Sequence, residues 1–514
     1  MRLVPSRRIP PTRTSHLSVS SFGLVVLLGA CSVGPDFASP QAPDAQGYTS
    51  DGRAASAVGT DVSGGDAQHF VKGRDIPGEW WRLFRSRTIN AMVSEAIRNH
   101  PDLEAAQAAL RAARENALAE GGSLLPQVGL TASETRIGVS PAQNGMRGPG
   151  RIFDLSNTSV AVSYDLDVFG GERRKIEGFE AAAESQRFQF EATQLALTAN
   201  VVTTVILDAS LRAQIAAIKD IIRAETEQRD LLKAQFGLGA VAQTDVLLQE
   251  SNLAQSKATL PPLEKALAQN RNQLMAYLGR LPSQDRGEQV ALGDLRLPGE
   301  LPLSLPSSLV RQRPDVLAAE ENLRRANAQI GVATAAMLPK LSLSAAFGSQ
   351  ALSPSELFGA ETAAWNVAAG VAQPIFKGGS LLHGRESAIA TRDQAAAQYR
   401  STVIKAFQNV ADALRAIQAD ARTLAAQVEA ERVATRSLEI ARSQFKVGGT
   451  TWTTVLTADQ AYQSARIARV KAQAQRHADT AALFQALGGG WWNRIDEGPT
   501  AQPRPIGEIF AGRD

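Results

Sequence analysis

Few side chains in this sequence have the types and spacing that catalysis or metal binding requires. The chain of 514 residues has one cysteine, so no intrachain disulfide can form. Asp165 and Asp167 could form a carboxylate dyad, but their place in an alternating strand favours the wall of a water-filled lumen. No close pair of metal ligands occurs among the five histidines, which are His16, His69, His100, His383 and His477. We therefore expect neither an active site nor a metal.

Two further motifs have structural interpretations. Leu487-Gly-Gly-Gly-Trp491 could suggest a phosphate loop, but the Lys-Ser/Thr pair is missing and the glycines end a helical stretch instead of beginning one. They predict a helix stop. Trp80 and Trp81 fit packing better than a ligand cage.

The lone cysteine follows a segment with the features of a secretory signal. Four arginines without an acid precede the apolar stretch 22–30, which predicts a signal peptide over residues 1–30. Leu28-Gly-Ala-Cys31 resembles a bacterial lipoprotein box, in which the cysteine is acylated and becomes the new amino-terminus. An ordinary signal with a chance cysteine is the alternative. Because Ser32, not aspartate, follows Cys31, we expect delivery to the outer membrane, with covalent lipid on Cys31 as the only added group.

Composition argues against several function classes. A hydrophobic fraction of 44% with 20% charged residues is ordinary for a folded chain. The formal net charge of +3 includes the four signal-segment arginines, so the mature chain is nearly neutral and no nucleic-acid partner is implied. Beyond residue 31 no stretch approaches the roughly 18 apolar residues of a spanning helix, so we expect any membrane span to be β.

The sequence contains an internal repeat, in which one structural unit occurs twice. Arg98-Asn-His-Pro-Asp-Leu103 recurs as Arg311-Gln-Arg-Pro-Asp-Val316, and Leu125-Pro-Gln-Val-Gly-Leu130 recurs at the same offset as Leu338-Pro-Lys-Leu-Ser-Leu343. A constant offset over this distance indicates duplication of a whole structural unit. The expected parts are an amino-terminal belt segment 31–87, a first repeat 88–282, a connecting segment 283–302, a second repeat 303–490 and a tail 491–514.

Each repeat is predicted to hold the same elements in the same order. A helix over 101–121 begins with a proline and an aspartate, which suit a first turn. Two alternating stretches follow, and the apolar positions of 160–168 and 341–347 have the period of a strand. Proline-free helices over 172–236 and 380–445 come next, each roughly 100 Å long at 1.5 Å per residue. An apolar stripe of Leu207, Leu211, Ile215, Ile218 and Ile222 supports the first of them.

A returning helix follows each long helix, from about Asp245 and Thr453. Pro261-Pro262 should kink or restart the first return. At the two hairpin tips, Gly239 and Gly448 suit left-handed residues just past a helix end, while Asp245, Thr453 or Thr454 can accept amide hydrogen bonds at the next start.

These features resemble the TolC-like outer membrane factors of tripartite efflux systems, specifically the NodT-type lipoprotein branch. The resemblance rests on the order of short motifs along nearly the whole mature chain: residues 31–36, 80–84, 101–102, 125–126, 166–170, 373–376, Gly448 and 487–491. It implies a mostly α fold with a small β part. Long α-helical hairpins would form a periplasmic tunnel, and four β-strands per chain would contribute to a trimeric twelve-stranded transmembrane barrel.

The same resemblance implies a function, partners and a place in the cell. The chain would be a passive duct that exports drugs or other small molecules from periplasm to exterior. It would be lipid-anchored in the outer membrane, and would work as a homotrimer with a periplasmic adaptor and an inner-membrane transporter of RND type. The tip residues Gly239, Asp245, Gly448, Gly449, Thr450 and Thr451 would face the adaptor at the closed periplasmic aperture. Some relatives place an aspartate just after the second glycine, and its absence here puts a cation-binding acidic ring in doubt.

Two other classes of function remain open at this level. A periplasmic coiled-coil scaffold or adaptor lipoprotein would also contain long hairpins, but the two hairpins with paired strands opposite their tips favour the channel. A lipid-anchored enzyme would need a nucleophile or an acid-base pair that this sequence does not offer.

The lipoprotein motif generates the first prediction. We expect Cys31→Ala to prevent acylation, because the thiol is the acceptor of the lipid. Incorporation of labelled fatty acid measures this, and label retained by the variant would contradict the assignment. A single acyl chain binds membranes only marginally, so a β-barrel should still hold much of the variant in the membrane.

Overall fold

The computed structural model describes residues 32–45, 47–49, 57–62 and 64–494. The expected signal peptide, the lipid acceptor Cys31 and the tail beyond residue 494 lie outside the described residues. The chain divides into two compact units, and each unit takes segments from both sequence repeats. The first comprises the chain up to Phe37 with Ala117–Phe179 and Arg324–Asp393; the second comprises Ala38–Asn116, Glu180–Leu323 and the chain from Gln394 onward.

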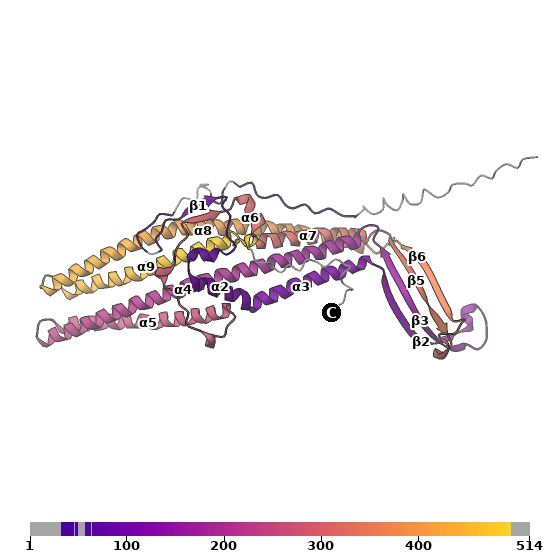
Figure 1. Cartoon of the computed structure of the whole chain (residues 1–514), viewed down its shortest axis with the longest axis horizontal. Helices are drawn as coiled ribbons and strands as arrows, with labels where there is room; N and C mark the ends of the chain where they lie inside the picture. Colours follow the sequence, from indigo (N-terminus) through magenta and orange to yellow (C-terminus); the bar gives the residue numbers. More distant parts are fainter. Residues whose placement is uncertain (1–31, 46, 50–56, 63, 495–514) are drawn as a thin grey trace, which may run out of the picture. The chain divides into compact units, whose positions relative to one another are not determined.

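The first unit is built around a four-stranded antiparallel sheet (Figure 1). Its order is β2-β3-β5-β6, with bounds Gln127–Val139, Arg151–Leu166, Lys340–Ala351 and Ala363–Ala372. Each repeat supplies one hairpin, and β3 pairs with β5 to join them, with Val160 opposite Phe347. The alternating stretches are thus strands, as the period-two pattern predicts.

Long helices follow the strands in both repeats. The first repeat contains α3 (Pro101–Gly121), α4 (Gly171–Gly237) and α5 (Gln243–Tyr277), and the second contains α7 (Pro314–Ala335), α8 (Ser380–Lys446) and α9 (Trp452–Ala486). The two long helices have 67 residues each and the two returning helices 35 each. The two hairpins therefore match each other in the lengths of both helices.

The structure corrects one expectation about these helices and adds a detail to another. The helix α5 does not restart at Pro261-Pro262 but continues through both prolines. Both prolines are exposed, as are Lys257 and Ala258, whose carbonyls lose their helical donors there and can bond to water instead. Leu207 is 48% exposed, so the buried stripe of α4 does not include it.

The helix α4 also corrects an expectation about membrane spans. By length and composition it could cross a membrane in one window, whereas we expected no such stretch beyond residue 31. That window is 67% buried inside the structure. Burial of this kind is typical of a core helix in a water-soluble region, because its apolar side chains pack against other helices.

Segments from outside the repeats form a belt in the second unit. Strand β1 (His69–Lys72) pairs in parallel with β4 (Glu300–Leu303), which joins the amino-terminal and connecting segments. The helices α2 (Arg87–Asn99) and α6 (Pro306–Gln312) lead into the two repeats. The short 3-10 turns are η2 (Trp80–Phe84), η3 (Gly122–Leu124), η4 (Pro141–Asn144), η5 (Pro282–Gln284), η6 (Leu292–Asp294), η7 (Pro354–Glu356) and η8 (Trp491–Asn493).

Aromatic packing fixes the belt to the carboxyl-terminal helix. Trp80 is fully buried, and its ring stacks on Phe484 of α9 with centroids 5.4 Å apart. Trp81 is 4% exposed in the same core, which confirms the packing interpretation of this pair. Next to this core α9 ends at Ala486, and the amide of Gly489 donates to the carbonyl of Phe484 at 2.9 Å. The glycine run is therefore a helix stop, as expected.

One histidine is buried beside this core without a hydrogen-bond partner among the described residues. Both ring nitrogens of His477 on α9 are unpaired, and the side chain lies against Gly64 and near the ring of Phe84. Burial, and then the neighbouring Arg476 guanidinium, lower the pKa of His477 to about 4. The His477 ring is therefore neutral in the folded protein near neutral pH.

This histidine predicts a pH-dependent stability. Since the unfolded pKa of 6.5 lies above the folded one, unfolding takes up a proton, and stability is lost as pH falls from about 6.5 towards 4. The loss at pH 5 should be about 2 kcal/mol. We expect His477→Leu to remove this part of the acid sensitivity, measured as unfolding midpoints at pH 7 and pH 5.

Wild type must be measured beside the variant, because a second buried group, Asp420, changes the stability with pH in the opposite direction. Burial and the adjacent Asp479 raise the pKa of Asp420, so its contribution weakens stability as pH rises. An unchanged pH dependence in the leucine variant would contradict the assignment to His477.

Candidate functional site

The sheet of the first unit has one apolar face and one polar face. Strand partners share a face, so the pairs Leu130 with Val160 and Val160 with Phe347 place one apolar surface across three strands. That face also includes Trp365, Val367 and Val371 of β6, which are 72–74% exposed. The opposite face carries small and polar residues such as Ser163, Ser344 and Ala368, whose backbones are paired in register. This is the pattern of a sheet that meets lipid on one side and water on the other.

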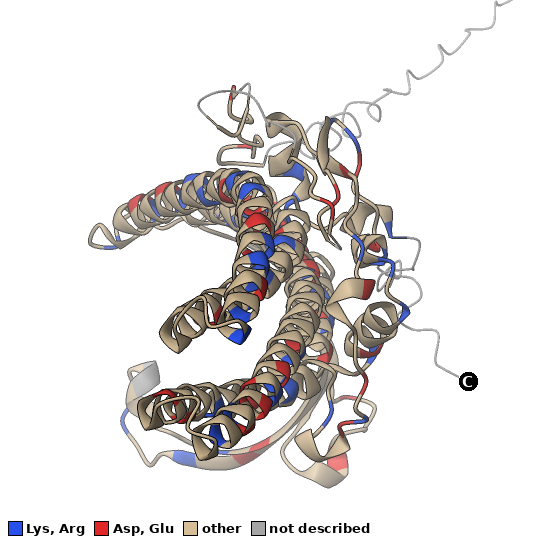
Figure 2. Cartoon of the chain, turned by 90° about the vertical axis from the view of Figure 1, so that its left-hand side faces the viewer, with Lys and Arg blue, Asp and Glu red and all other residues tan. Residues whose placement is uncertain are grey.

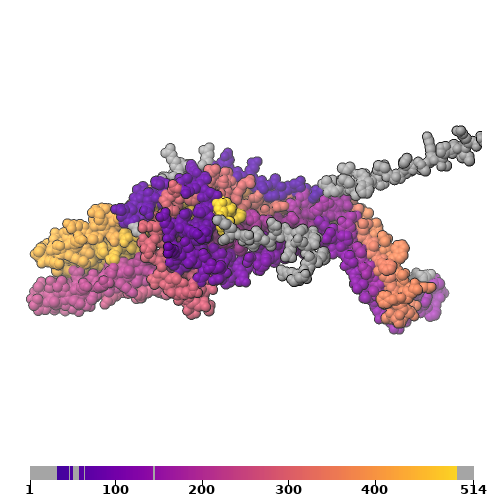
Figure 3. Space-filling view, in the orientation of Figure 1, coloured from indigo at the N-terminus to yellow at the C-terminus, as the bar shows by residue number. Residues whose placement is uncertain are grey.

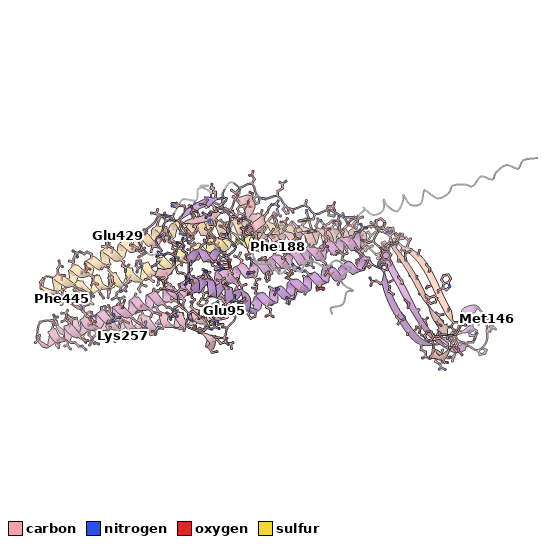
Figure 4. All side chains as sticks on the ribbon, in the orientation of Figure 1. Glu95, Met146, Phe188, Lys257, Glu429 and Phe445 are labelled. Carbon is pink, nitrogen blue, oxygen red and sulfur yellow. The ribbon has the colours of Figure 1, made fainter. Side chains whose placement is uncertain are left out.

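The apolar band ends before the strands do. Towards the loop that joins β2 and β3, Arg136 lies opposite Asp154, and their side chains form an ion pair of 3.7 Å. Met146 lies in that loop (Figure 4). Charged residues at this end of an otherwise apolar face indicate where the surface would leave the hydrocarbon.

Both outer strands of the sheet have a free edge. β2 pairs only with β3, and β6 pairs only with β5, within the described residues. An open edge in lipid leaves backbone amides without partners, which costs several kcal/mol each. The four strands of one chain therefore need further strands at both edges.

The two aspartates of β3 and its end have separate structural roles. Asp165 pairs with Lys340 across the β3 and β5 strands at 2.9 Å, and both side chains are exposed. Asp167 instead caps α4, because its carboxylate accepts from the amides of Glu172 and Arg173 at 3.0 and 2.9 Å. The expectation that Asp167 lines a wet lumen is therefore wrong. Its side chain turns back onto the start of its own helix.

The hairpin tips are built in the same way in both repeats. Gly239 and Gly448 each have a φ of +75°, the left-handed conformation that the sequence predicts. After α4 the amides of Gly239 and Ala240 donate to the carbonyls of Phe236 and Gln235, both at 2.9 Å. After α8 the amides of Gly448 and Gly449 donate to Phe445 and Gln444 at 3.0 and 2.8 Å. These are Schellman closures, in which glycine avoids the cost of a side chain at positive φ.

The starts of the returning helices differ from one another. Asp245 accepts from the amide of Ala242 at 3.4 Å, which is half of a capping box, since an alanine has no oxygen to complete it. At the second tip the hydroxyl of Thr451 lies 2.7 Å from that of Thr453 and 3.2 Å from that of Thr454. The threonine hydroxyls bond with one another instead of capping amides, contrary to expectation.

The two tips share a small apolar core in the second unit. Trp452 is 2% exposed and packs with Leu232 of α4, Val246 of α5 and Leu438 of α8. Its ring meets Phe445, which lies near the end of α8, with centroids 5.1 Å apart (Figure 4). The two hairpins lie side by side in this region (Figures 1 and 3). The exposed Leu238 and Val447, at 85% and 83%, stand outside this core just before the two glycines.

Polar links also join the two hairpins, and sequence reasoning missed them. Arg466 of α9 donates to Asp220 of α4 at 2.9 Å. Gln463 of α9 donates to Glu225 of α4 at 2.7 Å, which places a buried carboxylate between the hairpins. The residues concerned lie far apart in sequence and form no motif, so only the fold brings them together.

Among the residues that the structure describes, Glu225 receives several neutral donors and no cation. Its carboxylate accepts from Asn252 at 2.7 Å and Ser256 at 3.0 Å, both on α5. Burial is the main cause that raises the pKa of Glu225. The buried Asp459 of α9 also has a raised pKa from burial, although Arg442 donates to it at 3.0 Å. This region is thus a polar layer that holds four helices together, α4, α5, α8 and α9.

The described residues of the hairpins and the sheet contain no candidate metal centre, and the hairpins do not carry charge of one sign only. In the described part of the chain no group of three histidine, cysteine or acidic side chains could hold a metal ion. Basic and acidic side chains are interspersed along both hairpins (Figure 2). The geometry is that of paired helical hairpins and a sheet with two open edges.

Comparison with known proteins assigns this geometry to a family. The family described as outer membrane efflux protein matches residues 92–280 and 305–489. The chain belongs to the outer membrane efflux protein family. It is 30% identical to the pyoverdine export outer membrane protein OpmQ of Pseudomonas putida, over 82% of this chain and 90% of that protein. It is 27% identical to the probable efflux pump outer membrane protein TtgC of the same species, over 94% and 96%.

Solved structures of outer-membrane channels have the same fold. The channel OprN superposes with a TM-score of 0.81 at 26% identity, covering 90% of this chain and all of OprN. VceC of Vibrio cholerae gives 0.76 at 25% identity, over 81% of this chain and all of VceC. The expected fold, with helical hairpins and four strands contributed to a barrel, is confirmed.

Family membership also confirms the expected function and location. The chain is the outer-membrane channel component of an efflux pump and extends from the outer membrane into the periplasm. It forms trimers and works with a periplasmic adaptor and an inner-membrane pump. The pore-free scaffold is therefore set aside. Like its relatives the chain is a channel protein.

The tip geometry generates a prediction about function. We expect Gly448→Val to weaken efflux without abolishing assembly, because a side chain at positive φ costs about 1–2 kcal/mol and distorts the turn. No atom lies within 4 Å of the position a new Cβ would take, so the effect comes from the backbone alone. Drug tolerance of cells that depend on this channel measures efflux.

A neighbouring glycine supplies the control. Gly237 has equally open surroundings and no positive φ, so Gly237→Val adds the same side chain without the left-handed strain. Wild-type tolerance in Gly448→Val, or an equal loss in both variants, would remove the left-handed turn from the mechanism.

Proposed function

We propose that the chain is a lipid-anchored, passive duct for small organic molecules, driven by an inner-membrane transporter of RND type. Two observations together support the proposal of a passive duct. The sheet has a small and polar inner face, and the described residues hold no group of metal ligands. We infer that the energy for export and the choice of substrate come from the partner proteins.

The breadth of the relatives supports a duct without selectivity of its own. Proteins 27–30% identical to this chain carry names that refer to pyoverdine export, antibiotic efflux and toluene efflux. A siderophore and an aromatic hydrocarbon share little chemistry, so a common channel architecture serves both. We infer that this chain likewise accepts small molecules chosen by its pump.

The proposals of a lipid anchor and of an RND partner are based on the sequence. Cys31 follows a signal segment in a lipoprotein box, and the NodT-type resemblance points to RND transporters. The tips carry Leu238 and Val447, two exposed apolar side chains beside rigid glycine turns, which suit contact with a protein partner. We propose Gly239, Asp245 and Gly448–Thr451 as the adaptor-facing surface.

The passive duct can be tested on the purified protein. Three chains supply twelve strands, whereas eight strands from two chains would enclose only their own side chains. We expect a trimer by mass measurement in detergent, and stepwise conductance in a planar bilayer without any energy source. A stable monomer or dimer, or a bilayer that stays silent, would contradict the duct.

The pump type needs a separate experiment in cells. In a strain without its own outer-membrane channels, the chain should restore drug tolerance together with an RND transporter and its adaptor. Rescue only with an ATP-driven transporter would overturn the RND assignment and leave the duct intact.

A further inference from the structure

The polar face of the sheet carries one ion pair among strand residues that are almost all uncharged. Asp165 of β3 lies opposite Ser342 of β5, and Lys340 lies two residues before Ser342 on the same face. The Lys340 ammonium meets the Asp165 carboxylate at 2.9 Å. Among the described strand residues of this face, Arg151 is the one other charged residue, and it lies at the far end of β3, roughly 45 Å away at 3.3 Å per residue.

The ion pair lies on the two central strands of the sheet. Beside it the same face carries two rows of uncharged residues, Ser163 with Ser344 and Ala368, and Ala161 with Ala346 and Asn366. Because the apolar face meets lipid, the polar face lines the lumen once three chains close the barrel. Closure joins the outer strands β2 and β6, so it leaves the ion pair on β3 and β5 open to the lumen. Symmetry then places three such pairs at one level of the wall.

The ion pair adds little to the stability of the sheet. The side chains of Lys340 and Asp165 are 66% and 51% exposed, and ion pairs between exposed groups contribute little to folding. The backbones of β3 and β5 are already paired in register along their length, so the ion pair is not needed to set that register. Its main physical effect is on the electrostatic potential in the lumen, because the ammonium cancels the field of the carboxylate.

An unpaired charge at this level would act on solutes across much of the lumen. Twelve strands about 4.8 Å apart, tilted by about 40°, enclose a barrel with a backbone radius of roughly 12 Å. The Debye length is about 10 Å at 0.1 M salt, which is comparable with this radius. A low-dielectric wall also strengthens the field inside. Three bare carboxylates would therefore concentrate cations and repel anions, and three bare ammonium groups would do the reverse.

We propose that Asp165 and Lys340 form a charge-compensated collar at the end of the barrel next to the helices, which admits cationic and anionic small molecules equally. This inference rests on the proposed passive duct. It adds a physical reason why solutes of either charge are accepted, since opposite charges are held side by side at one level of the wall.

A cysteine introduced beside the collar measures the local potential, and no solute has to cross the whole channel. Ser342→Cys places a thiol directly opposite Asp165 at an exposed position. The measured quantity is the ratio of its reaction rates with a cationic and an anionic methanethiosulfonate of similar size, on the full-length trimer in detergent. Protein that keeps Ser342 gives the background from the single native cysteine.

The two charges of the collar should shift this ratio in opposite directions. Lys340→Gln removes the ammonium, so we expect a shift of roughly threefold towards the cationic reagent at about 0.1 M salt. Asp165→Asn should shift the ratio about as far towards the anionic reagent, and the double variant should return it to the wild-type value. All shifts should shrink at about 1 M salt, where the Debye length is about 3 Å. Ratios that ignore both single variants, or that move the same way in both, would overturn the collar.

A second cysteine position is the matched control. Asn157 lies on the same face of β3, roughly 26 Å from Asp165 and more than two Debye lengths away at about 0.1 M salt. The ratio at Asn157→Cys should not follow the charge of Lys340 or Asp165, and an equal shift there would contradict a local collar. If neither thiol reacts in assembled trimers, the polar face is dry, and the duct and the collar are both wrong. Reactive thiols whose ratios ignore the two charges refute only the collar.

Discussion

A four-stranded sheet in a bilayer must find partners for the backbone amides of its outer strands, and much of this protein follows from that requirement. β2 and β6 are open within one chain, and neither can face hydrocarbon without a cost of several kcal/mol per unpaired group. Closure by further copies satisfies both edges at once and encloses a lumen. The same closure explains the two faces of the sheet, because Leu130, Val160 and Phe347 meet lipid while the small residues in between leave an open bore. Assembly and conduction are therefore consequences of one hydrogen-bonding constraint.

The second unit holds its two long hairpins together by contacts near their tips. The tips combine a small apolar core around Trp452 with polar links, of which Arg466 with Asp220 and Gln463 with Glu225 join α9 to α4. Glu225 is bonded only by neutral donors and has a raised pKa. Such a carboxylate gains less from its surroundings than one paired with a cation, so the layer is weaker than an equally buried ion pair would be.

The sequence predicted conformations that depend on adjacent residues, but it did not predict contacts between elements that lie far apart in the chain. Gly239 and Gly448 could be assigned a left-handed conformation because a helix end is determined by a few adjacent residues. The strand faces followed from period two for the same reason. Leu207 has the predicted helical spacing but is 48% exposed, since spacing defines a stripe and not which edge of it a neighbouring helix covers. Asp167 was misjudged because alternation describes the strand and ignores the helix that follows it. Glu225 and Arg466 carry no signal in sequence, as their partners lie in other elements.

The bond between Asn327 and Pro35 joins residues 292 positions apart. Loop closure over such a distance is entropically costly, and contacts of high sequence separation form late. Residues 32–37 can therefore reach their place only after most of the chain has been synthesised and secreted, and after β3 and α7 have come together. These residues leave the ribosome early but are among the last parts to be built into the fold.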